Sequence, residues 1–497
     1  MNFTKIKFFS AKPAVQLCLL IVIAAVVRII FFNGIVFSDD TYYDFLGISL
    51  VKGHYAQGYL GYPIFLLRKL HTVFTALAFF VFGINQISSI IFPFIISIAG
   101  IIVAYFLSFE LTNNRRIAIL TSLLLAFFPS DIIFATINFT DLQSAFFINL
   151  GLLFLIKSVK SQSPGKSIIA GFLFFTSLLL KENIYFILIL LTLLMLYYFK
   201  NKNISYKFIF ISLLAFSVLL FFEAIYYSAA TNDFFYRLHT LNANYQFCSY
   251  DFFPNTIVAN PNNAAELFAG LMKQIFLLNT KYFFLRRFYL FLPLIALGYS
   301  FYLIKSNEQK LLIFWFLGLA ILMIGFTTSF TDYKPLDLRR NYYIFIALSP
   351  IIILTASLLS KVRIKLLFFI ILIYIISSFI MSHKYQTFFD VKSNQRFIEF
   401  VKENQDKTMY TDHHTAYGLY VISKFKNKNI KIITNKPNIQ FNANSLVIYN
   451  KDEIDELEKQ KFIFPKFNGI KKSNLKLINN FGKFSVFTKL KMGLNNK

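Results

Sequence analysis

Repeated apolar runs constrain the fold of this chain more than any other feature of its sequence. The first run extends from Ala14 to Val36, and further runs recur as far as residue 381. About 20 apolar residues in a helix cross the ~30 Å hydrocarbon core of a bilayer, where backbone polar groups must be bonded internally. Since 57% of the residues are hydrophobic and 15% are charged, we predict an all-α polytopic membrane protein.

Basic residues near the ends of these runs predict the orientation of each span. Lys5, Lys7 and Lys12 place the N-terminus in the cytoplasm, and counting onward gives about eleven transmembrane helices. Proline and basic residues interrupt the run 63–82, which we therefore interpret as a re-entrant or interfacial helix. The predicted outer loops comprise residues 37–85, 131–141, 229–282 and 330–341.

The chain divides into a predicted transmembrane domain, residues 1–382, and a predicted extracytoplasmic domain, residues 383–497. The second part contains short segments with strand-like alternation and two helical segments. The predicted strands lie near residues 408–411, 430–434 and 446–449, with a closing hairpin around Gly482, and the predicted helices lie at 415–425 and 452–459. This pattern indicates a small C-terminal α/β domain.

The formal net charge of +26 is compatible with a nucleic-acid partner, but the positions of the charges argue against one. Many basic residues flank the predicted spans, and neither a basic helix nor an RNA-binding motif is present. We therefore predict no nucleic-acid partner. Cys18 lies in the first span and Cys248 in a distant loop, so no disulfide between them is expected.

Several ionisable residues collect on the predicted outer side, close to membrane depth. Such residues are costly there and are candidates for function. Carboxylates bind divalent metals or accept a proton from an attacking hydroxyl, and lysine and arginine bind phosphate. Together with apolar walls, this mixture suits a phosphate carrying a long lipid tail. The residues are Asp39, Asp40, Asp131, Asp141, Lys181, Glu182, Arg339 and Arg340.

Each of these residues also has a purely structural interpretation. Ser38 or Asp39 can cap a short interfacial helix, and Lys181 can extend its stem from a helix end. Arg28 can pair with an acid inside the bundle. We interpret His413 and His414 as a helix start or a surface pair, because adjacent histidines point in different directions and no third ligand is spaced beside them.

The order of several short motifs resembles the C-type (GT-C) membrane glycosyltransferases, in the branch of protein O-mannosyltransferases and lipid A aminoarabinose transferases. The resemblance covers most of the chain and departs from the branch at Asp40, where glutamate is usual, and at Asn341, which is inserted between arginine and tyrosine. The motifs are Asp39-Asp40-x-x-Tyr43 with Gly47 and Gly53, Tyr62-Pro63, Phe82-Gly83-Ile84-Asn85, Asn113-Asn114-Arg115-Arg116, Phe128-Pro129 with Asp141, Leu180-Lys181, Tyr342-Tyr343 with Pro350, and Tyr410-Thr411-Asp412 with Leu419-Tyr420.

This resemblance implies an inverting sugar transfer from a polyprenyl-phosphate donor to a lipid, glycan or protein acceptor. It implies a bacterial inner-membrane protein with a periplasmic C-terminal domain. We expect three catalytic acids, a divalent metal cation held by two of them, and a substrate-binding group of one tyrosine and three basic residues. The acids are Asp39, Asp40 and Asp141, the metal ligands are Asp39 and Asp141, and the substrate-binding residues are Tyr43, Lys181, Arg339 and Arg340.

Two other classes of protein share part of this pattern. A flippase or polymerase for lipid-linked glycans is also hydrophobic with charges on its outer face, although a flippase more naturally has charges within several spans and two inverted halves. A sensor or scaffold with an extracytoplasmic domain leaves the acidic loops unexplained. Release of polyprenyl phosphate and a bound divalent metal would distinguish the enzyme from both classes.

Overall fold

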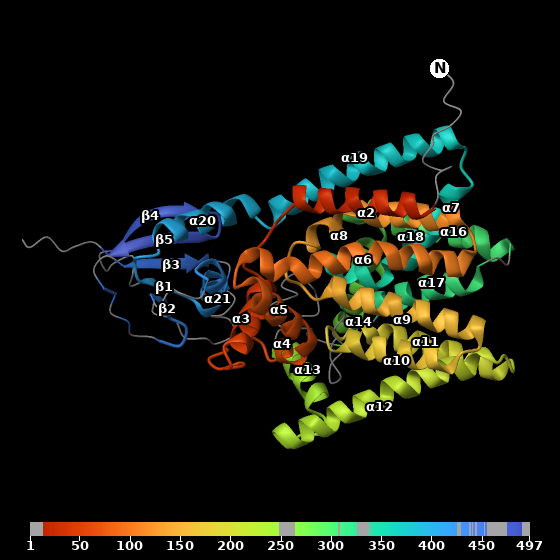
Figure 1. The fold of residues 1–497 in the computed structure, drawn as a ribbon, viewed down its shortest axis with the longest axis horizontal. Helices are drawn as coiled ribbons and strands as arrows, with labels where there is room; N and C mark the ends of the chain where they lie inside the picture. Colours follow the sequence, from red (N-terminus) through yellow and green to blue (C-terminus); the bar gives the residue numbers. More distant parts are fainter. Residues whose placement is uncertain are drawn as a thin grey trace, which may run out of the picture.

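A computed structural model shows a bundle of long helices with a small domain containing a β-sheet at one end (Figure 1). Short helices lie between the bundle and the domain. The structure describes residues 13–247, 264–306, 309–325, 336, 338, 340–424, 429–436, 439, 441–442, 445–451, 453–454 and 475–489. Arg339, Cys248 and most of the predicted acidic helix at 452–459 lie outside the described residues.

Apolar helices form the bundle at the positions where the sequence predicts spans. Asparagine side chains begin two of them: Asn85 accepts hydrogen bonds from Ile87 and Ser88, and Asn114 accepts them from Arg116 and Ile117. The helices are α2 (Pro13–Ile30), α6 (Gln86–Thr112), α7 (Arg115–Ala126), α9 (Asp141–Ser161), α10 (Pro164–Leu178), α11 (Ile184–Lys200), α12 (Ser205–Thr231), α16 (Leu292–Ser306), α17 (Lys310–Gly325), α18 (Phe345–Ser360) and α19 (Ile364–Phe388).

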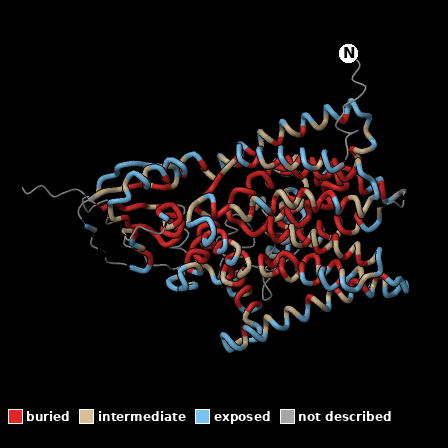
Figure 2. The backbone as a smooth tube through the Cα atoms, in the orientation of Figure 1, coloured by how far each residue is buried: buried red, intermediate tan, exposed pale blue. Residues whose placement is uncertain are grey.

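Five helical segments among the described residues are long and apolar enough to cross a membrane. They are 86–112, 141–161, 205–231, 342–360 and 364–388. This supports a multi-pass membrane protein, whereas the total of eleven spans stays a prediction. Figure 2 shows exposed residues along the outer helices of the bundle and buried residues at its centre. The apolar residues exposed on α12 and α19 are therefore a surface for lipid.

Short helices join the long helices and cover the end of the bundle, and among them α3 packs against the C-terminal domain. The predicted helix at 63–82 is divided at Arg68 into α4 and α5. These connecting helices are α3 (Asp39–Val51), α4 (Ile64–Leu67), α5 (Lys69–Phe82), α8 (Pro129–Phe134), α13 (Tyr236–Phe247), α14 (Ala264–Met272), α15 (Thr280–Phe284), the π-helix η1 (Lys273–Asn279) and the 3₁₀ helices η2 (Arg287–Tyr289) and η3 (Asn341–Ile344).

The C-terminal domain has the predicted mixture of helices and strands. Its sheet has the strand order β2-β1-β3-β5-β4, in which β1 pairs in parallel with β2 and β3, and β5 pairs antiparallel with β3 and β4. The elements are α20 (Val391–Glu403), β1 (Met409–Thr411), α21 (His413–Ile422), β2 (Ile430–Ile432), β3 (Leu446–Asn450), β4 (Leu475–Phe481) and β5 (Phe484–Lys489).

The structure refines two sequence interpretations. α19 continues to Phe388, beyond residue 382, where the sequence places the boundary between the two domains, and that boundary stays a prediction. His413 begins helix α21, as the helix-start interpretation predicts, but both His413 and His414 are buried rather than at the surface. Their rings lie against Tyr42 of α3, where the domain packs on the connecting helices.

An ion pair in the bundle core explains two of the charges noted in the sequence. The buried Arg28 guanidinium on α2 donates to the Asp131 carboxylate on α8 and to Ser97 on α6. The prediction that Arg28 pairs with an acid inside the bundle is thus confirmed. Asp131, which the sequence places in an outer loop beside Asp141, belongs to this buried pair and not to a solvent-facing loop.

Candidate active site

Asp39 begins helix α3 at the end of the bundle that faces the C-terminal domain. Ser38, before it, has an extended backbone, so the chain turns sharply into the helix. Asp39 is half-buried, and its carboxylate has no hydrogen bond or ion pair with any residue that the structure describes. It lies close enough to Tyr43, Arg340 and Tyr342 to interact electrostatically with each.

Asp40 has a different environment from its neighbour. Its side chain is buried and accepts hydrogen bonds from the backbone N–H groups of Val36, at 2.8 Å, and Ser38, at 2.6 Å. Burial raises the pKa of Asp40 to about 7, against the opposing effect of these two hydrogen bonds. The Asp40 carboxyl therefore holds the loop that leads into α3, while Asp39 faces the site.

Asp141 and Lys181 form a buried ion pair. Asp141 begins α9, Lys181 lies between α10 and α11, and the Lys181 Nζ is 2.6 Å from an Asp141 carboxylate oxygen. The Lys181 ammonium also lies 4.5 Å from the ring centroid of Tyr342 and 5.5 Å from that of Tyr343. Because Tyr342 interacts electrostatically with both Asp39 and Asp141, these two acids border the same site.

The Arg68 side chain links helix α3 to Glu182, the residue that follows Lys181. Its guanidinium donates to the Tyr43 hydroxyl, at 2.5 Å, and to the Glu182 carboxylate, at 3.1 Å. The Tyr43 hydroxyl also lies 3.4 Å from the Thr140 hydroxyl, next to Asp141. The break between α4 and α5 at Arg68 turns this side chain inward, where it is buried.

A second buried arginine lies beside this group. Arg237 on α13 donates to both carboxylate oxygens of Glu223 on α12, at 2.6 and 2.9 Å, and lies 3.9 Å from Glu182. Sequence reasoning missed both residues, although Glu223 is an acid within an apolar helix and so has the same signal that selected Asp141. Arg340, beside η3, donates to the Tyr342 hydroxyl at 2.7 Å.

The C-terminal domain holds the loop before Asp39 in place. The His414 ring contacts the Ser38 carbonyl at 2.9 Å, and Lys483 donates to the Val36 and Phe37 carbonyls at 3.2 and 2.9 Å. Phe37 has a φ of 52°, an uncommon backbone conformation for a bulky residue. Its ring packs against Phe397 and Phe484 in the core of the domain.

Comparison of the sequence with protein-family models and with curated proteins finds no match. Solved structures do match along most of the chain. ArnT from Cupriavidus metallidurans bound to undecaprenyl phosphate has a TM-score of 0.59 at 11% identity, over 96% of this chain and 98% of that one. The Archaeoglobus fulgidus oligosaccharyltransferase tethered with an acceptor peptide has a TM-score of 0.51 at 13% identity, over 99% and 75%. The chain has the GT-C fold.

The GT-C fold raises the question of a metal, because the same oligosaccharyltransferase matches as a complex with zinc and sulfate, with a TM-score of 0.50 at 16% identity, over 85% of this chain and 59% of that one. The described residues contain no group of three histidine, cysteine, aspartate or glutamate side chains that could hold a metal ion. Of the predicted ligands, Asp141 is bound to Lys181, and Asp39 lies near Arg340. These cations disfavour a divalent ion, so the residues present fit the predicted metal poorly.

Proposed function

We propose that this GT-C protein transfers a sugar from a polyprenyl-phosphate-linked donor to the hydroxyl or phosphate of a lipid, glycan or protein acceptor. One observation supports this most: an Asp39 carboxylate without a partner among the described residues lies near Arg340, and Tyr342 lies between it and the buried Lys181. A base, a group of cations for phosphate and a surface for lipid are the three parts that such a transfer requires.

Asp39 acts as the general base in this proposal. The acceptor O–H gives its proton to the Asp39 carboxylate, and the acceptor oxygen forms a bond to the anomeric carbon of the sugar. The bond between that carbon and the phosphate oxygen breaks on the opposite side, so the configuration inverts and polyprenyl phosphate leaves. Asp39 has no partner among the described residues, which supports this role, because an acid already saturated with hydrogen bonds is a weaker base.

The cations bind the phosphate of the donor. Negative charge develops on the phosphate oxygen as the glycosidic bond breaks, and fixed cations in a water-poor site stabilise that charge strongly. Lys181 and Arg340 fill this role, with Arg68 beside them. Tyr342 and Tyr43 orient these cations through their rings and hydroxyls. Asp141 keeps Lys181 charged and in place.

The location of the reaction follows from the orientation that the basic loops predict. The active site and the C-terminal domain would face the periplasm of a bacterial inner membrane, where lipid-linked sugars and their acceptors meet. The solved structures with undecaprenyl phosphate and with an acceptor peptide have the same fold, which supports this class of donor and of acceptor.

The test is sugar transfer in proteoliposomes supplied with a polyprenyl-phosphate sugar. Asp39→Asn keeps the shape of the side chain and removes its charge, so transfer should fall by about 100-fold or more while the protein stays folded. Glu399→Gln, at an exposed acid on α20, is the matched control and should keep full activity. Full transfer by a well-folded Asp39→Asn variant would exclude this function for Asp39.

A further inference from the structure

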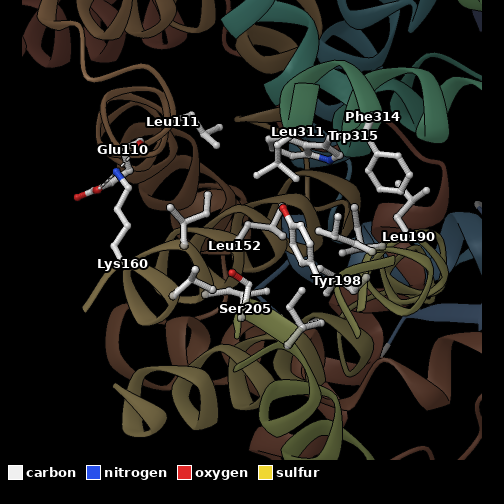
Figure 3. A pocket seen from close by; sticks show the side chains of 17 residues that line it. Glu110, Leu111, Leu152, Lys160, Leu190, Tyr198, Ser205, Leu311, Phe314 and Trp315 are labelled. Carbon is white, nitrogen blue, oxygen red and sulfur yellow. Dashed lines mark hydrogen bonds and ion pairs between the residues drawn. The ribbon is translucent and has the colours of Figure 1, made fainter. Parts of the chain in front are cut away.

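A cavity lies at the opposite end of the bundle from the candidate active site. It has a volume of about 280 Å³ and is enclosed by α6, α9, α11, α12 and α17. Figure 3 shows the side chains around it, which are mostly apolar. Leu152, Leu155, Ile187 and Leu190 form much of its wall. None of the residues that line it belongs to the proposed transfer site.

Trp315 supplies an unused hydrogen-bond donor to this cavity. The side chain is only 8% exposed, and its indole Nε1 has no hydrogen-bond partner among the described residues. In Figure 3 the indole nitrogen lies on the side of the ring that faces the cavity. A buried N–H without an acceptor is costly. The arrangement is therefore suited to a ligand that is mostly hydrocarbon but contains an acceptor oxygen.

Glu110 and Lys160 lie at the rim of the cavity, and a second lysine, Lys157, lies beside them. Lys160 lies 2.9 Å from the Glu110 carboxylate, and Lys157 lies 4.0 Å from the same side chain, so two lysines share one acid. Lys160 is exposed at the end of α9. Trp315 is the sixth residue of α17, which places it about 8 Å along the helix axis from that helix's end. A ligand that fits the cavity therefore carries negative charge at the rim and a hydrogen-bond acceptor slightly deeper, beside the Trp315 indole.

We propose that this cavity binds an acyl chain of an anionic glycerophospholipid. The chain fills the apolar interior, a chain-ester carbonyl accepts the Trp315 N–H, and the phosphate lies at the rim near Lys157 and Lys160. A polyisoprenoid tail satisfies the apolar wall but contains no acceptor for the indole, and a zwitterionic headgroup gains less from the excess of lysine. The site is a binding site for bilayer lipid, separate from the donor site.

Trp315 is the single tryptophan of the chain, so its fluorescence reports on this cavity alone. The full-length protein in detergent micelles is titrated with phosphatidylglycerol brominated on its acyl chains, and separately with the matching phosphatidylcholine. We expect saturable quenching by the phosphatidylglycerol at a concentration at least tenfold lower than for phosphatidylcholine. Unlabelled phosphatidylglycerol should reverse the quenching.

Three variants test the proposed contacts. Leu152→Phe fills part of the cavity and should weaken the phosphatidylglycerol quenching at least tenfold, while Leu193→Phe, on the exposed face of α11, should leave it unchanged. The double variant Lys157→Gln with Lys160→Gln should abolish the preference for phosphatidylglycerol. It leaves the apolar wall of the cavity intact, so its result holds even if Leu152→Phe fails to fold.

Two outcomes would overturn the proposal. Equal quenching by both lipids, unaffected by Leu152→Phe, would mean that Trp315 senses only bulk lipid. Displacement of the brominated lipid by an equimolar amount of undecaprenyl phosphate, but not by unlabelled phosphatidylglycerol, would identify an isoprenoid chain as the occupant. Neither outcome depends on sugar transfer, so this test and that of the proposed function fail independently.

Discussion

At the scale of single residues, the buried ion pair between Lys181 and Asp141 contributes both to the stability of the fold and to the positive charge of the candidate site. Both side chains are buried, so removal of one partner leaves the other as an unpaired charge. Breaking a buried pair in this way typically costs about 3–5 kcal/mol, whereas replacing both partners by neutral groups costs much less. Stability and phosphate binding can therefore be separated by a double substitution.

We predict that Lys181→Met and Asp141→Asn each lower the melting temperature, and that the double variant recovers most of this loss. Sugar transfer should not recover, because the proposed phosphate contact needs the ammonium group itself; kcat/KM for the donor should stay at least tenfold below that of the unmodified protein. Thermal unfolding and donor kinetics on the three variants measure the two effects. Recovery of transfer together with stability would assign the pair a structural role only.

Asp44 supports a prediction on pH dependence. This buried acid on α3 accepts hydrogen bonds from Ser89, at 2.5 Å, and Asn138, at 2.8 Å, and its other oxygen has no partner among the described residues. Burial and the charge of Asp40 raise its pKa to about 8. Between about pH 4 and pH 8 the folded protein binds a proton that the unfolded chain releases, so this contribution to stability is lost as the pH rises.

Asp44→Asn resembles the protonated acid at every pH and should remove this loss. At pH 8.5 the variant should melt several degrees above the unmodified protein, and at pH 4 the two should melt close together. Unfolding of purified protein at both pH values is the measurement, with the exposed Asp406→Asn as control. A variant that is less stable at pH 8.5 would show that Asp44 is ionised in the fold.

Sequence reasoning reached part of the candidate site because ionisable residues are conspicuous at the ends of apolar runs. Asp39, Asp141 and Lys181 were found in this way. Asp131 carries the same local signal, and only its contact with Arg28, 103 residues away in the chain, shows that it belongs to the bundle core. Contacts of this length are set by tertiary packing, which no local pattern encodes.

At the scale of elements, the loop from Val36 to Ser38 joins the C-terminal domain to the proposed base. Its carbonyl groups accept from Lys483, and the Phe37 ring lies so close to α21 that a Cβ on Gly418 would meet it at 2.6 Å. A loop with an uncommon backbone conformation persists only where its surroundings determine it. We therefore expect the C-terminal domain to fix the position of Asp39 through its contacts with this loop.

We predict that Lys483→Met lowers kcat about tenfold with little change in KM for the donor, because it displaces the base and not the phosphate site. Lys483→Arg should restore most of the rate, since it keeps a donor at the same carbonyls. Lys476→Met, on the exposed face of the neighbouring strand, is the matched control. Equal losses in the methionine and arginine variants, or a change confined to KM, would contradict this positioning role.

The elements themselves differ in how far the sequence predicts them. Long apolar helices and the short strands of the C-terminal domain lie close to their predicted positions, because hydrophobic periodicity is a local property. The division at Arg68 and helix α20 were not predicted. Arg68 leaves the helical conformation to reach Tyr43 and Glu182, which no local pattern indicates. Helix α20, in contrast, has the local apolar spacing of an amphipathic helix, with Phe397, Ile398 and Val401 buried, so its sequence contained a signal that was missed.

At the scale of the whole molecule, the two ends of the bundle differ in charge and in partners. The candidate active site and the C-terminal domain lie at one end (Figure 1). The other end of the bundle has exposed lysines near the junctions of α9 with α10 and of α11 with α12. The cavity that Trp315 lines lies at this end too. If basic loops face the cytoplasm, the site must face the opposite side.

The last prediction tests this orientation. Reporter fusions after Lys166 and Lys202, at the basic end, should be active only as cytoplasmic reporters, and a fusion after Lys384, close to the end of α19, should be active only as an exported one. The bundle fixes the relation between these positions, because α9 and α19 each run its length. A cytoplasmic reporter signal after Lys384 would place Asp39 in the cytoplasm as well, since His414 and Lys483 bind the loop before it. The proposed reaction would then have to use a donor and an acceptor on the cytoplasmic face.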